Sequence, residues 1–129
     1  MSSILVEDSD LFNITVRYVE KEGNKIEVVG DDIKDVKNAK SLTVTFRRPD
    51  YSSSQAIVSA STEYSASGPN LNMMALKNNL FSVLARSWDL KDDKGQPIPM
   101  TPETMGRLRV EIAKEILMRL IESQGENII

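Results

Sequence analysis

The sequence predicts an α+β domain in which helices pack on one face of a small antiparallel sheet. In the first third of the chain, apolar and polar residues alternate with a period of two, as in half-buried strands. The remainder repeats apolar residues at helical spacing. Strands followed by a run of helices are typical of this class. We expect one domain over residues 1–129, with a β-hairpin and charged connector in 1–40 and a strand plus three helices in 41–129.

The sheet should consist of the N-terminal hairpin plus one further strand. Its first strand is marked by alternating apolar residues, namely Phe12, Ile14, Val16 and Tyr18. A polar turn at residues 20–25 follows, in which Gly23 can adopt a positive φ. The second strand carries Ile26 and Val28 and ends at Gly30. After the charged connector of residues 31–40, a third strand is expected at residues 41–48, ending before Pro49 because proline cannot donate to a strand ladder.

Three helices are predicted after this strand. The first is short and serine-rich, with Asp50 or Ser52 as its N-cap, and residues 65–69 form a break after it. The second begins at Asn70 or Asn72 and runs to about Trp88, before a polar loop of residues 89–100.

The last helix has the clearest start and stop signals. Thr101 is a good N-cap and Pro102 suits the first helical position, so the helix should begin there and run to about Ser123. Gly125 is available to end it.

Composition excludes most catalytic chemistry. The chain contains no Cys and no His, which removes disulfides, Cys nucleophiles, Ser–His–Asp triads and the usual zinc ligands. Its net charge is 16 − 19 = −3, which argues against a nucleic-acid partner. No apolar run is long enough for a membrane helix, and the N-terminus lacks a signal-peptide pattern, so we expect a cytoplasmic protein that binds no membrane.

The carboxylates give no sign of a catalytic or metal site. The adjacent pairs Asp31–Asp32 and Asp92–Asp93 lie in charged, turn-like segments, without the apolar surroundings that raise a carboxyl pKa. A calcium loop starting at Asp89 would place Lys91 and Lys94 where oxygen ligands and glycine are needed, so that template fails. We therefore expect no enzymatic activity, cofactor or metal.

The helices carry more apolar surface than a small sheet needs. Apolar residues of the last helix span roughly 220° of the helix wheel at about 100° per residue, whereas a surface helix needs a stripe somewhat over about 100° wide. Two explanations remain open: the helices pack on each other and the sheet, or one of them also buries a partner, such as a second copy or a client helix. The candidate partner-binding residues are Leu80, Leu84, Trp88, Leu108, Ile112 and Ile116.

Two further features bear on partner binding. Apart from Met1, every methionine lies in the second half of the chain, and flexible thioethers suit surfaces that adapt to varied apolar partners. Arg47 and Arg48 form a compact basic pair at the end of the third strand. Their side chains lie over the sheet surface, contact a protein partner or contact nucleic acid, although the last would need more basic residues and aromatic rings on the same face.

The order of motifs from residue 41 to the C-terminus resembles the small tail assembly chaperones of long-tailed bacteriophages. The segments that carry the resemblance are Val44–Pro49, the apolar helix ending in Ser87–Leu90, the loop Asp92–Pro99 and the helix start Thr101–Glu103. The N-terminal hairpin lies outside this resemblance.

The resemblance implies a non-enzymatic role. Such chaperones coat the long helical tape-measure protein while the tail tube polymerises around it, and they are absent from the mature virion. Many weak contacts along one long client would add by multivalency. The expected partners are therefore the tape-measure protein or another tail protein, with a second copy of the chain as a further possibility. The alternative is a structural virion subunit of the tail, neck or baseplate, in which the N-terminal strands form the sheet.

Overall fold

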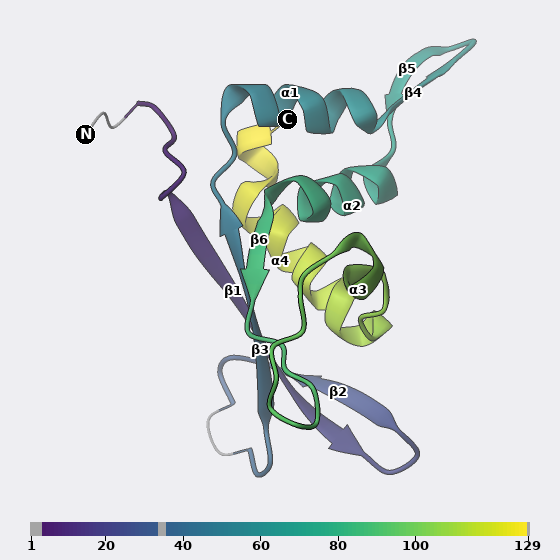
Figure 1. Cartoon of the computed structure of the whole chain (residues 1–129). Helices are drawn as coiled ribbons and strands as arrows, with labels where there is room; N and C mark the ends of the chain where they lie inside the picture. The colour runs from purple at the N-terminus through teal and green to yellow at the C-terminus, as the bar shows by residue number, and fades with distance from the viewer. Residues whose placement is uncertain (1–3, 34–35, 129) are drawn as a thin grey trace.

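The computed structural model describes residues 4–33 and 36–128 and confirms the α+β class. One antiparallel sheet has four strands in the order β2-β1-β3-β6, and the long helices lie on one of its faces (Figure 1). A separate two-stranded hairpin, β4-β5, projects from the body of the molecule (Figure 1). The sheet therefore has one strand more than predicted, and the chain forms a second small sheet that was not predicted.

The N-terminal hairpin forms as predicted. Strand β1 (Leu11–Lys21) pairs antiparallel with β2 (Lys25–Val29). The turn between them places Gly23 at φ 77° and Asn24 at φ 59°, a region that glycine enters freely and asparagine tolerates. The connector that follows includes residues 34 and 35, which lie outside the described residues.

Strand β3 (Lys40–Arg47) pairs with β1 from Leu11↔Arg47 to Tyr18↔Lys40. Alternation puts Leu42, Val44 and Phe46 on the helix-covered face, where all three are buried. The opposite face carries hydroxyl and amide side chains that bond across the strands. Thr15 and Thr43 are joined through their Oγ1 atoms at 2.8 Å, and Thr45 donates to Asn13 at 2.8 Å.

Helix α1 (Tyr51–Ala60) begins at the predicted cap, because Asp50 Oδ1 accepts from the Ser53 N–H at 2.7 Å. The break expected at residues 65–69 is instead the tip of a hairpin. Strands β4 (Thr62–Ser65) and β5 (Gly68–Leu71) pair here, with Gly68 at φ 108°. Turn-forming residues end a helix and reverse a strand equally well, so the local sequence did not distinguish the two.

Helix α2 (Met73–Leu84) starts at the predicted Asn72 cap but ends four residues before Trp88. The prediction that this helix continues to Trp88 is wrong, because the chain turns into strand β6 (Ala85–Trp88). Strand β6 pairs with the open edge of β3, with Val44 opposite Trp88 and Thr45 opposite Ser87. Pairing with β3 gives the backbone N–H and C=O groups of β6 the hydrogen-bond partners that a continued helix would have given them. It also places Trp88 against the core.

The predicted last helix is two helices. Helix α3 (Pro102–Gly106) has the expected Thr101 cap and a capping box with Thr104, but it lasts little more than one turn. Helix α4 (Val110–Ile128) follows and runs through Gly125, so the predicted stop there is wrong. The turn before Gly125 is held in place by buried Leu120 and Gln124, and glycine in a helix costs only about 1 kcal/mol relative to alanine.

The core lies between the sheet and helices α1, α2 and α4. Three aromatic rings join its layers: Phe12 stacks on Phe46 with centroids 5.5 Å apart, and Phe46 meets Phe81 edge-on at 5.8 Å. The other buried core residues come from both the N-terminal hairpin and the strand-plus-helix region. They are Ile14, Val16, Leu42, Val44, Ile57, Leu76, Leu80, Leu84, Ile112, Ile116 and Leu120.

Candidate functional site

An apolar groove of about 500 Å³ lies between helices α2, α3 and α4. We call it the helical groove. Most of its lining is hydrocarbon or thioether, and Arg86 is the one ionisable side chain among the residues that line it. The lining residues are Asn78, Phe81, Ser82, Ala85, Arg86, Met100, Pro102, Met105, Gly106, Leu108, Ala113 and Leu117.

The floor and one wall of the groove exist because α3 and α4 are separate helices. Helix α3 is fixed by its caps: the Thr101 side chain accepts from Thr104 N–H, and Thr104 Oγ1 donates to Pro99 O at 2.7 Å. The chain then changes direction at Arg107, which closes the helix. Met105 and Leu108, on either side of this break, lie partly buried beside α2.

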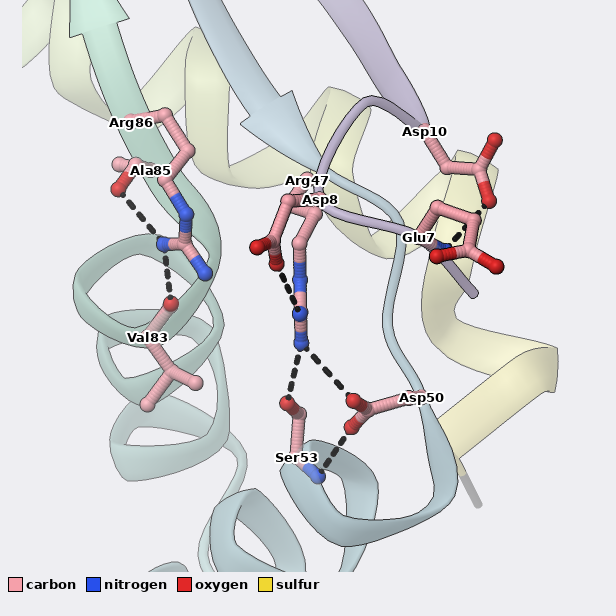
Figure 2. Close-up of polar contacts among 9 residues, drawn as sticks. All are labelled: Glu7, Asp8, Asp10, Arg47, Asp50, Ser53, Val83, Ala85 and Arg86. Carbon is pink, nitrogen blue, oxygen red and sulfur yellow. Dashed lines mark hydrogen bonds and ion pairs between the residues drawn. The ribbon is translucent and has the colours of Figure 1, made fainter. Parts of the chain in front are cut away.

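The other wall is the C-terminal half of α2 and the first residues of β6. Phe81 spans the core and the groove, since it packs on Phe46 and also lines the cavity. Helix α2 ends at Leu84, and Arg86 caps it by donating from Nη1 to Val83 O at 2.9 Å and to Ala85 O at 3.0 Å (Figure 2). A cation is favoured at this end of a helix because the last carbonyls carry partial negative charge.

Four of the six apolar residues proposed for partner binding are core residues. Leu80, Leu84 and Ile116 are fully buried and Ile112 is 4% exposed, so none of them presents a surface to a partner in this structure. Their placement at the interface is therefore corrected. The physical reason is that the sheet gains a fourth strand and the helices pack on one another, which covers more apolar surface than a three-stranded sheet would.

The other two apolar candidates remain partly accessible. Leu108 lines the helical groove. Trp88 lies outside the groove lining, on β6, where it packs against the core and its Nε1 donates to Ile98 O at 2.6 Å. Trp88 thus ties the loop of residues 89–100 to the sheet, and this loop delivers Met100 to the groove.

Arg47 and Arg48 are not among the residues that line the groove, although Arg47 follows Phe46, which pairs with the groove residue Ala85. Arg47 is largely buried and bonds to the carboxylates of Asp8 at 3.3 Å and Asp50 at 3.0 Å, and to Ser53 Oγ at 3.1 Å (Figure 2). Arg48 lies over the Phe12 ring, 5.8 Å from its centroid. Of the three interpretations of this basic pair, the structure favours packing within the protein.

The pKa of the Asp50 carboxyl is lowered by this arrangement. The hydrogen bonds from the Ser53 N–H and hydroxyl are the main cause, and the Arg47 guanidinium adds to it. The carboxylate therefore serves as a helix cap and ion-pair partner.

Sequence reasoning did not nominate most of the groove. Phe81, Met105 and Leu117 were apparent only as members of broad apolar helix faces, and Met100 only as one of the clustered methionines. That clustering of methionine in the second half of the chain was the signal that could have found Met100 and Met105. The excess width of the last apolar face is now explained: one part is core, and Ala113 and Leu117 line the groove.

The acidic segments have local structural roles. In the loop after β6, Asp92 Oδ1 accepts from the backbone N–H groups of Lys94 and Gln96, and Asp89 Oδ1 accepts from Thr43 N–H. Asp31 pairs with Arg119 of α4 at 2.9 Å. Within residues 4–33 and 36–128, no cluster of three or more His, Cys, Asp or Glu side chains is arranged to hold a metal ion.

No helix in the described part of the chain combines the length and apolar character needed to span a bilayer. Comparison of the chain with protein-family models, with curated proteins and with solved structures gives no match.

Proposed function

We propose that this protein is a non-enzymatic tail assembly chaperone of a long-tailed bacteriophage, and that the helical groove binds apolar stretches of the tape-measure protein. The observation that carries the proposal is the groove itself, an accessible apolar concavity that includes Met100 and Met105 on its wall. The motif order from residue 41 onward supports the same class. The role implies that the protein works in the host cytoplasm, where tails assemble.

The dimensions and chemistry of the groove suit transient binding. Its volume of about 500 Å³ accommodates a few side chains, which corresponds to part of one apolar stripe on a helix. A contact of that size is weak by itself. Many copies along one long client would nevertheless hold it, and the growing tube could displace them one at a time. Methionine side chains adapt to varied apolar partners, which suits a client without a repeated sequence.

Co-expression with a tape-measure segment from the same phage genome tests the proposal. Wild-type protein should raise the soluble fraction of that segment. Met105→Lys, which places a charge on the groove wall, should abolish the effect, whereas Met118→Lys, at an exposed position of α4 outside the groove lining, should preserve it. A segment that stays equally insoluble with and without the wild-type protein would contradict the proposal.

A structural virion subunit is the second candidate, and the uncovered face of the sheet favours it. At its centre, that face carries Asn13, Thr15, Thr43 and Thr45, which bear no charge and are exposed or half-exposed, and Arg17 and Arg47 lie towards its ends. Depletion of charge is common at the centre of protein interfaces, so another tail subunit could stack there. Mass spectrometry of purified particles separates the candidates, because a chaperone is released and a subunit remains in many copies.

A further inference from the structure

Arg86 is one of four arginines that form no ion pair in the described part of the chain, with Arg17, Arg48 and Arg107, and it is the one arginine among the residues that line the groove. Arg47, Arg109 and Arg119 each form an ion pair with a carboxylate of the chain. Among the described residues, no carboxylate pairs with Arg86, although it lies on the wall of the helical groove. The Arg86 side chain is held in place by two hydrogen bonds, to the carbonyl oxygens of Val83 and Ala85. Nη1 donates both of them (Figure 2).

We infer that the groove selects an amphipathic helix that carries a carboxylate beside its apolar stripe, and that Arg86 binds that carboxylate. The inference rests on the proposed function and defines the chemistry of the client at the same site. Nη2 and Nε of Arg86 form none of the described hydrogen bonds. Two such N–H groups can meet both oxygens of a carboxylate in a bidentate pair.

The electrostatics of the groove support an acidic partner over a basic or neutral one. Every other lining residue is uncharged, so no acidic group of the lining competes for the guanidinium. The two carbonyl bonds already restrict the Arg86 side chain, which lowers the entropy lost when a partner binds. An apolar groove alone would accept a helix in several registers and both directions, whereas one fixed charge at its wall would favour a single arrangement.

Three synthetic helical peptides test the inference with the full-length protein. They share one stripe of Leu and Met and differ only in Glu, Gln or Lys at a position flanking the stripe, placed at either end in separate sets. Affinities are measured by fluorescence anisotropy at low and high salt. We expect the Glu peptide to bind about three- to ten-fold more tightly than the Gln peptide, with the Lys peptide weakest and the difference shrinking at high salt.

Two variants test whether Arg86 causes the tighter binding of the Glu peptide. The preference for Glu should disappear in Arg86→Gln and persist in Arg107→Gln, which removes a neighbouring exposed arginine that does not line the groove. Circular dichroism shows whether each variant is folded, and the Gln peptide reports whether its groove still binds.

The outcomes separate this inference from the proposed function. Equal affinity for all three peptides, lost in Met105→Lys, would overturn the role of Arg86 and leave the groove as the client site. No binding of any peptide would count against the proposed function as well. A groove filled by a second copy of this chain would also overturn the inference, and it would appear as a dimer that Met105→Lys dissociates and Arg86→Gln does not.

Discussion

Replacing Trp88 with phenylalanine tests whether β6 fixes the loop that completes the helical groove. The indole Nε1 donates to Ile98 O at 2.6 Å, and phenylalanine cannot make this bond. A lost hydrogen bond costs about 0.5–1.5 kcal/mol. The smaller ring also buries less apolar surface, for which we expect roughly another 0.5–1 kcal/mol at this partly buried site. The expected decrease in the free energy of unfolding is therefore about 1–2.5 kcal/mol.

Two measurements check this expectation. Urea denaturation followed by far-ultraviolet circular dichroism gives the free energy of unfolding without the fluorescence of Trp88, the one tryptophan in the chain. Limited trypsin digestion reports on the loop through its exposed residues Lys91 and Lys94. Because the indole bond restrains the loop at Ile98, cleavage at these lysines should become faster in Trp88→Phe. Affinity for an apolar helical peptide should fall too, since Met100 follows in the same loop.

Tyr64→Phe is the matched control, because it also changes one aromatic side chain but at an exposed position. Tyr64 is 82% exposed on the projecting hairpin and its hydroxyl makes none of the described hydrogen bonds, so Tyr64→Phe should change neither stability nor cleavage. If Trp88→Phe costs no more than Tyr64→Phe and leaves the rate of cleavage unchanged, the indole bond does not hold the loop, and the account of how Met100 reaches the groove is wrong.

Three further outcomes are expected. Gly125→Ala should raise the free energy of unfolding by about 0.5–1 kcal/mol in urea denaturation, because α4 continues through this position and an added Cβ would only touch Ile121 at 3.7 Å. Leu80→Ala should lower it by about 2–5 kcal/mol, since Leu80 is fully buried, and a loss below about 0.5 kcal/mol would contradict its place in the core. The pKa of Asp50 is lowered on folding, so the stability that its ionised form provides is present above the ordinary aspartate pKa and is lost as the pH falls through the lower, folded value. Acid titration of unfolding should therefore show a smaller stability loss in Asp50→Asn, which keeps a capping oxygen but does not ionise, than in the wild-type protein.

Local signals account for the parts of the fold that the sequence predicted well. Alternation and a glycine turn define the β1–β2 hairpin, and polar side chains that bond to nearby backbone define the helix starts at Asp50, Asn72 and Thr101. Each of these depends on residues within a few positions of one another. A short window of sequence therefore contains the information that sets them.

The errors arise where a distant part of the chain decides the local structure. Phe81, Leu84 and Trp88 continue one helical face, and nothing local ends the helix before Ala85. The decisive partner is the free edge of β3, about forty residues earlier, which offers backbone hydrogen bonds to residues 85–88. At the break after Gly106, glycine weakens the helix locally, but the apolar pattern continues across it, so the sequence predicted one helix where the chain forms two.

The same distant contacts create the candidate site. If α2 continued to Trp88, Ala85 and Arg86 would lie on one more helical turn and Arg86 would not cap the helix beside the groove. If α3 and α4 formed one helix, Met105 and Leu108 would continue its axis and would not close the groove around α2. Both interruptions are required for a concave apolar surface. A sequence pattern that predicts continuous helices selects their most apolar residues as partner-binding candidates, and these are the residues that the fold buries. The same pattern does not reveal the groove, because the groove forms where the helices end.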